Sequence, residues 1–374
     1  MNSKRRNIVL CFIAGIVVLV GIGLVYQRRH EKKFTIAINL PLSGPIAAFM
    51  GPYPDALQMG LEDGFQRLGM PIDSFHLDVQ DNAGKPSQAL SVVQQQILRG
   101  FDIYISGSSE MTTAILPEVD ARNVPHFLIA FDAYMTSKGP NRLRILPHYK
   151  LEGPQWVEYV KQRGAKRAAL LTLNNAPIEE EFTDIVEPGL KNLGVEFKRE
   201  RFEWTGSDYR TLALKVQSFK PDVILVNGYS VHLYPIISAL RSLNLVRGEN
   251  VLASLDFDDL LYNGTPGQDL VGVAFITPVF EVTAADNRQK EWKQRFESRF
   301  DKRATYVAAY AYDTGVIIAK AASRTPAPSK KDIVGVLPYD GVAGRISLDA
   351  VGDLDSTLVL AKLNSAYAPV RLFP

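Results

Sequence analysis

From Phe34 to the C-terminus, short apolar runs alternate with segments of helical periodicity. Parallel strands need long crossover connections, which are usually helices, so this alternation is typical of an α/β fold with parallel sheets. A length of 374 residues favours two domains over one. We expect strands at Phe34–Asn39, Phe75–Gln80, Asp102–Ser106, His126–Ala130, Ala168–Leu173, Asp222–Asn227, Val251–Ser254 and Val271–Thr277.

Charge divides the chain into a basic N-terminal segment and a slightly acidic remainder. Residues 1–33 hold seven Lys and Arg against one acid, whereas residues 34–374 hold 35 against 39. A nucleic-acid-binding domain needs a concentrated basic face that neutralises phosphates. The charge of the main region therefore argues against nucleic acid as a partner.

The N-terminal segment contains a charge-free apolar run, Ile8–Tyr26, between two basic clusters. As a helix it would extend about 28 Å, close to the thickness of the hydrocarbon core of a bilayer. We interpret residues 1–33 as an uncleaved signal anchor with one transmembrane helix. The alternative is a cleaved signal peptide, with Gly21 and Gly23 as weak small residues before the cut. Both flanks are basic, so flanking charge does not fix the orientation.

The sequence contains no recognisable binding motif for a metal or a cofactor. Cys11 is the one cysteine and lies in the apolar run, so residues 34–374 have no thiol for a disulfide, a metal or a nucleophile. The H-E-x-x-H, P-loop and strand-linked G-x-G-x-x-G motifs are also missing. We therefore expect no cofactor and no metal.

One segment, Gly228–His232, resembles the setting of a hydrolase nucleophile elbow, because it follows an apolar strand and precedes a helix. The elbow requires a second glycine, and His232 stands in that place. A Ser-His-Asp triad of this type also needs a later histidine, and none follows His232. We expect no catalytic residues and no enzymatic activity.

Six short motifs, each weak alone, occur in the order found in one protein family. They are Ile36–Pro45 with Pro-Leu-Ser-Gly-Pro, Asp81-Asn82 followed by Pro86–Ala89, Leu143–Pro147, Ser207–Tyr209 with Asn227–Tyr229, Ala309–Asp313, and Asp340–Gly344 with Gly352-Asp353. On these motifs the chain resembles the type I periplasmic binding proteins related to the leucine/isoleucine/valine-binding protein. The resemblance runs from about Phe34 to the C-terminus.

The resemblance implies two doubly wound α/β lobes joined by three hinge crossings. We expect lobe 1 at 34–147 plus 280–327 and lobe 2 at 148–279 plus 328–374. It also implies an extracytoplasmic protein that binds a small polar solute, such as an amino acid, and delivers it to the permease of an ABC transporter. The alternative function is a ligand-sensing domain in a membrane signalling complex.

Family positions can be carried over to six candidate ligand-binding residues. In the first lobe, Phe49 matches an aromatic that covers the ligand, Ser109 matches a serine that binds its carboxylate, and Phe131-Asp132 stands where the family has Ala-Thr or Ala-Ser. In the second lobe, Tyr229 matches a family aromatic and Asp256 an acid that receives the ligand ammonium.

Each candidate also has an ordinary structural interpretation. Phe49 and Tyr229 suit a hydrophobic core, and Ser109 and Asp256 suit helix caps. Asp132, by contrast, would repel a ligand carboxylate. With Asp132 and Asp256 in the cleft, we expect a ligand with a cationic or neutral donor group rather than a simple branched-chain amino acid.

Overall fold

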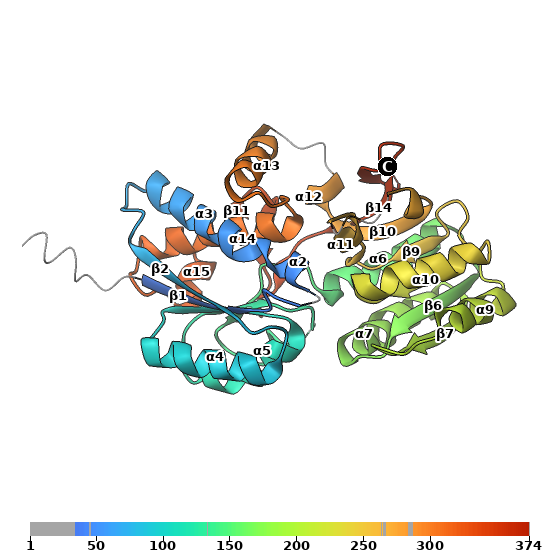
Figure 1. Cartoon of the computed structure of the whole chain (residues 1–374), viewed down its shortest axis with the longest axis horizontal. Helices are drawn as coiled ribbons and strands as arrows, with labels where there is room; N and C mark the ends of the chain where they lie inside the picture. Colours follow the sequence, from blue (N-terminus) through green and yellow to red (C-terminus); the bar gives the residue numbers. More distant parts are fainter. Residues whose placement is uncertain are drawn as a thin grey trace, which may run out of the picture.

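The computed structural model describes residues 34–44, 46–132, 134–262, 264, 267–282 and 287–373. The expected transmembrane helix at Ile8–Tyr26 lies outside these residues. Among the helices in the described ranges, none is both long and apolar enough to cross a membrane. The chain folds into two α/β lobes that lie side by side (Figure 1).

The first lobe is built on a five-stranded parallel sheet in the order β2-β1-β3-β4-β5. The strands are β1 (Phe34–Leu40), β2 (Phe75–Asp81), β3 (Ile103–Gly107), β4 (His126–Ile129) and β5 (Arg142–Leu143). Helices cover both faces of this sheet (Figure 1): α4 (Pro86–Arg99) and α5 (Ser109–Asp120) on one, α3 (Pro52–Arg67) and α14 (Tyr306–Ala322) on the other. Successive residues of β1 divide between these layers, because strand side chains alternate in direction.

The two helices α3 and α14 pack with their backbones almost in contact. A Cβ atom on Gly60 of α3 would overlap the backbone of Tyr312, and one on Gly315 of α14 would overlap the backbone of Leu57. Glycine at these two positions therefore permits the close approach. The packing joins a segment near the start of the chain to one near its end, so the first lobe is discontinuous in sequence.

The second lobe is built on a seven-stranded sheet in the order β15-β14-β10-β9-β8-β6-β7. Its strands are β6 (Arg167–Leu173), β7 (Glu196–Phe202), β8 (Val223–Asn227), β9 (Val251–Ala253), β10 (Val273–Pro278), β14 (Leu358–Leu363) and β15 (Pro369–Arg371). The first five are parallel, but β14 runs antiparallel to β10 and β15 antiparallel to β14. This sheet is therefore mixed, whereas we expected it to be parallel.

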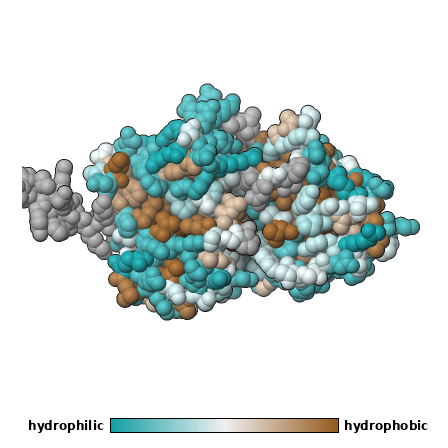
Figure 2. All heavy atoms as spheres, in the orientation of Figure 1, coloured by the Kyte–Doolittle hydropathy of each residue, from teal (hydrophilic) through white to brown (hydrophobic). Residues whose placement is uncertain are grey.

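Two groups of helices pack beside this sheet. One consists of α6 (Tyr149–Gln162), α7 (Ala176–Glu181) and α8 (Glu187–Asn192), and the other of α9 (Tyr209–Phe219), α10 (Ser230–Ser242) and α11 (Phe257–Tyr262). Strands β6 and β8 are almost wholly buried. Hydrophilic residues cover most of the visible face of both lobes, interrupted by apolar patches (Figure 2).

We propose that the chain passes between the lobes three times, with the third passage later than the expected boundary at 327/328. The helix α15 (Lys330–Val334) and a small sheet of β11 (Tyr339–Asp340), β12 (Arg345–Leu348) and β13 (Leu354–Asp355) remain beside the first lobe. Lys330 Nζ donates to the Arg142 carbonyl (2.8 Å), and the Asp313 carboxylate accepts from two N–H groups of residues 342 and 343. We therefore propose that the third crossing lies at 355–358, just before β14.

Candidate functional site

A cleft of about 530 Å³, its open mouth included, lies between the two lobes. Most of its walls come from segments that follow the carboxyl ends of strands, where parallel sheets offer loops and helix N-termini. The first lobe contributes Ile46, Phe49, Met50, Ser108, Ser109 and Phe131, and the second Trp204, Tyr229, Ser230, Val231, Asp256 and Asp259.

Five of the six candidate residues line this cleft: Phe49, Ser109, Phe131, Tyr229 and Asp256. They come from five separate segments of the chain, so the fold alone brings them together. Whether they contact a ligand stays a prediction.

The two phenylalanines form an aromatic wall on the first-lobe side of the cleft. Phe49, in α2 (Ala47–Met50), has its ring centroid 6.0 Å from that of Phe131 and 6.0 Å from that of Tyr306. Both phenylalanines are buried, at 9% and 8% exposure. They therefore pack as core residues on one side and line the cleft on the other, so the two interpretations of Phe49 are compatible.

Ser109 is the first residue of α5 rather than its cap. The residue before the helix is Ser108, whose side chain makes no capping hydrogen bond. The Ser109 hydroxyl accepts a long hydrogen bond from the Asp132 N–H, at 3.4 Å. The N-terminus of α5, with its positive dipole end and two serine hydroxyls, thus faces the cleft.

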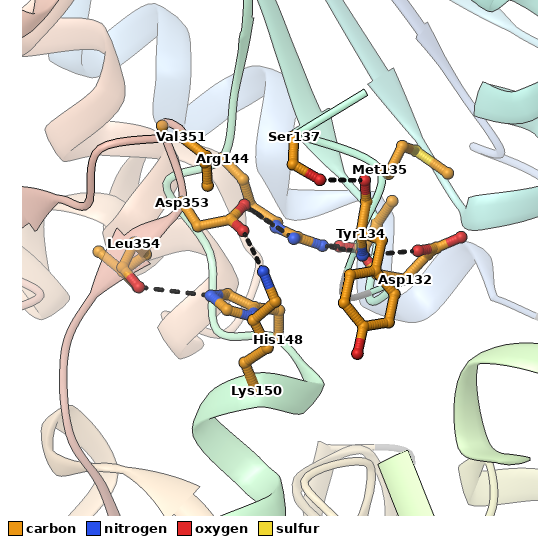
Figure 3. Close-up of polar contacts among 12 residues, drawn as sticks. Asp132, Tyr134, Met135, Ser137, Arg144, His148, Lys150, Val351, Asp353 and Leu354 are labelled. Atoms are coloured by element: carbon orange, nitrogen blue, oxygen red, sulfur yellow. Dashed lines mark hydrogen bonds and ion pairs between the residues drawn. The ribbon is translucent and has the colours of Figure 1, made fainter. Parts of the chain in front are cut away.

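Asp132 is the candidate that the structure does not place in the cleft wall. Its carboxylate accepts a hydrogen bond from the Tyr134 N–H at 2.9 Å (Figure 3). Aspartate commonly turns back in this way to bond the backbone two residues further on. A contact between Asp132 and the ligand beside Asp256 stays a prediction.

A buried arginine, Arg144, holds the segment that carries Phe131 (Figure 3). Its Nη1 donates to the carbonyls of Ala130 (2.7 Å) and Asp132 (2.6 Å), and its Nε and Nη2 donate to Asp353 Oδ1 (3.0 and 2.8 Å). Lys150 Nζ lies 3.5 Å from the other carboxylate oxygen. Burial opposes ionisation of Asp353, but the Arg144 guanidinium holds the pKa of this carboxyl below its usual value.

This ion pair connects two of the proposed crossings between the lobes. Arg144 follows β5 in the first crossing, and Asp353 lies next to β13 shortly before the third, where the two residues also form a parallel bridge. The segment Leu143–Pro147 was noted in the sequence only for its family resemblance. Its role in positioning the cleft wall depends on a partner 209 residues away, which no local pattern indicates.

Two carboxyl groups, Asp256 and Asp259, form the acidic part of the cleft. Burial raises the pKa of Asp256 well above its usual value, and the charge of Asp259 raises it further. Burial likewise raises the pKa of Asp259 to about 7, although its Oδ2 accepts a hydrogen bond from Ser230 Oγ at 3.3 Å. Of the described residues that line the cleft, none is Lys, Arg or His.

Two aromatic side chains form the second-lobe wall. The ring of Trp204 lies edge-on to that of Tyr229, with a centroid distance of 5.1 Å. Trp204 is 51% exposed and stands just after β7. Sequence reasoning missed Trp204 because it did not predict the strand that precedes it.

The Ser230–His232 segment does not form the paired serine and histidine of a nucleophile elbow. Ser230 Oγ donates to Asp259, while His232 Nε2 lies 3.1 Å from the Trp204 carbonyl. A search of the described residues for three or more clustered His, Cys, Asp or Glu side chains suited to a metal ion finds none.

Comparison with known proteins gives a family match over most of the chain. The family described as periplasmic binding protein matches residues 33–367. The Leu/Ile/Val-binding protein BraC3 of Rhizobium johnstonii is 24% identical over 229 residues, which span 55% of this chain and 58% of that relative.

Solved structures share the fold. The branched-chain amino acid substrate-binding protein LivJ of Streptococcus pneumoniae, in complex with isoleucine, superposes with a TM-score of 0.77 at 19% identity, covering 92% of this chain and 100% of that one. A solute-binding protein of an ABC transporter from Rhodopseudomonas palustris, in complex with 3,4-dihydroxybenzoic acid, gives a TM-score of 0.78 at 17% identity, covering 91% and 97%.

The family match covers far more than half of the sequence, and the solved relatives have the same two-lobed α/β fold. These findings agree with the order of the sequence motifs. The chain therefore belongs to the periplasmic binding protein family, as a type I member.

Proposed function

We propose that this protein binds a small polar solute, an amino acid or a related compound, in the cleft between its lobes and delivers it to the permease of an ABC transporter. The observation that carries the proposal is that five candidate residues from five separate segments line one cleft. The lining of the cleft is mainly apolar, with four aromatic side chains, and its polar groups gather at two positions.

Those polar groups suit the two ends of a small solute. On the first-lobe side, Ser108, Ser109 and the N-terminus of α5 offer hydrogen-bond donors and a positive dipole end to an anionic or acceptor group. On the second-lobe side, Asp256 and Asp259 offer acceptors to a donor group. A ligand that bonds to both lobes at once favours their closure over the open arrangement.

Relatives bind different solutes in the same fold, isoleucine in one case and an aromatic acid in another. The fold therefore does not identify the ligand here. We propose binding without catalysis, because solved relatives of this fold are solute-binding proteins and because Ser230 and His232 do not pair as a nucleophile and its base.

We also propose an extracytoplasmic location with the N-terminal segment as an uncleaved anchor. The support is the charge-free run Ile8–Tyr26 and the poor cleavage signal after it. Expressed in a Gram-negative host, the protein should sediment with membranes, and mass spectrometry should recover residues 27–33 joined to the preceding residues. A soluble form that begins near residue 24 would overturn the anchor and leave the cleaved alternative.

A thermal-shift screen tests ligand binding directly. The panel consists of amino acids, amides, diamines, short carboxylates and aromatic acids. A ligand at 100 times its dissociation constant should stabilise the native state by about 2.7 kcal/mol. If every compound leaves the melting temperature unchanged, binding of this class of solute is refuted.

Affinity purification from membranes tests delivery. A permease that is recovered with the full chain and lost when the ligand is removed supports transport. Recovery of a signalling protein in its place would favour the alternative function of ligand sensing.

A further inference from the structure

Resting on the proposed function, we infer that the cleft selects a solute with a positively charged nitrogen group, and that Asp259 acts with Asp256 as the pair of side chains that recognises it. The ligand class is an organic cation with several N–H donors: a protonated diamine, a guanidinium compound or a basic amino acid. Asp259 was not among the candidates from the sequence.

The two carboxyl groups are buried at the cleft, and no described residue provides either of them with a cationic partner. Asp256 and Asp259 are each 8% exposed, and both line the cleft. The one side-chain hydrogen bond to Asp259 comes from Ser230, a neutral hydroxyl, and no ion pair with either aspartate forms among the described residues. A buried carboxylate without a counter-ion is unfavourable, so a bound cation would stabilise both groups.

The ionisable groups around Asp256 also favour a cationic ligand. The ionisable groups that act on Asp256 are Asp259 and Glu152 of α6, and both are acids. Glu152 is itself fully buried, and its carboxylate accepts the Leu255 N–H at 2.8 Å. Arg303 acts on the neighbouring Asp258 instead. This side of the cleft therefore gathers three acidic side chains with no described basic group among them, and burial keeps their pKa values raised until a cation binds.

The position of the pair also fits a single ligand group. Asp256 immediately precedes α11 and Asp259 lies in its first turn, where the Asp259 N–H donates to the Asp256 carbonyl at 3.2 Å, and both side chains line the cleft. One ammonium or guanidinium group can therefore donate to both carboxylates. The aromatic side chains Tyr229 and Trp204 in the same wall can add cation–π attraction.

The chain supplies a matched control in Asp258. It is an adjacent, fully buried aspartate, but it does not line the cleft, and its Oδ2 accepts a hydrogen bond from Thr277 Oγ1 at 2.6 Å. Asp258→Asn changes the same functional group one residue away. Any general effect of removing a buried acid from α11 should appear in this variant as well.

The test is isothermal titration of the full chain and its Asp259→Asn and Asp258→Asn variants with arginine, ornithine, putrescine, leucine and 4-hydroxybenzoate. We expect at least one cationic probe to bind the unaltered protein more tightly than leucine and 4-hydroxybenzoate. Asp259→Asn should weaken that probe at least about tenfold, since it removes one partner of a buried charge pair. Asp258→Asn should change its affinity by less than about twofold. Circular dichroism confirms that each variant is folded.

The outcomes separate this inference from the proposed function. Tighter binding of leucine or 4-hydroxybenzoate than of every cation would overturn the inference and leave solute binding intact. An equal loss of affinity in both variants would also overturn it, because the effect would then not depend on the cleft. If no probe binds at all, the inference falls, and the proposed function loses its support for these solute classes.

Discussion

The buried ion pair between Arg144 and Asp353 makes the most specific stability prediction. Replacing Arg144 with methionine keeps a long apolar side chain but leaves Asp353 buried at 1% exposure, with Lys150 at 3.5 Å as its remaining ion-pair partner among the described residues. Removing one partner of a buried pair costs about 3–5 kcal/mol. The carbonyls of Ala130 and Asp132 also lose their donor.

We expect Arg144→Met to lower the free energy of unfolding by about 3–5 kcal/mol, a large part of the 5–15 kcal/mol typical of a native protein. Urea denaturation followed by circular dichroism measures this change. The variant should also bind solute more weakly, because Arg144 holds the segment that places Phe131 in the cleft wall.

A surface arginine provides the control. Arg201 makes two hydrogen bonds to Glu179, at 2.8 and 3.0 Å, but its side chain is 48% exposed. Exposed pairs contribute about 0–1 kcal/mol, so Arg201→Met should cost no more than that. If Arg144→Met costs as little as Arg201→Met, with an unchanged denaturant slope, the buried pair does not hold the crossings together and this reasoning is refuted.

Three further predictions concern packing, protonation and the ligand contacts. Gly315→Ala should lower the melting temperature sharply, since the new Cβ would overlap the backbone of Leu57. Gly335→Ala should not, because the nearest atom to its new Cβ would lie 3.2 Å away. The pKa of Asp259 is raised to about 7 in the folded state, so between about pH 4 and 7 the folded state keeps a proton that the unfolded state has lost. The free energy of unfolding should therefore fall by up to about 4 kcal/mol as pH rises across this range. Asp259→Asn should remove that part of the pH dependence. Equal slopes in urea titrations of the two proteins would contradict it. Ser109→Ala should weaken ligand binding by about 0.5–3 kcal/mol with a smaller effect on stability; a lower melting temperature with unchanged affinity would show a purely structural role.

Most of the fold could be predicted from the apolar runs, because buried parallel strands carry few polar residues. All eight expected strands are present within a few residues. The strand β7 was missed because Glu196–Phe202 is rich in charge: it lies at the edge of the sheet, where side chains remain exposed. The antiparallel strands β14 and β15 were missed because they follow no helix–strand alternation.

The candidate site shows where sequence reasoning stops. Phe49, Ser109, Phe131, Tyr229 and Asp256 were found by family resemblance, which carries long-range information that spacing alone lacks. Asp132 lies outside the cleft lining, with its carboxylate bonded to the backbone of its own turn, and the sequence does not show which way such a side chain points. Asp259 lies three residues after the candidate Asp256, but only the structure shows that both side chains line the cleft.

Binding between the lobes can be measured most directly through Trp204. It is 51% exposed at the cleft, whereas the other two tryptophans, Trp156 and Trp292, are buried at 0% and 2%. A saturating amount of the compound with the largest thermal shift should move the emission to shorter wavelength, because closure shields the Trp204 indole from water. Trp204→Phe should lose that change while calorimetry still detects binding. A change that persists in Trp204→Phe, or calorimetric binding to the unaltered protein with no change in emission, would contradict binding in the cleft.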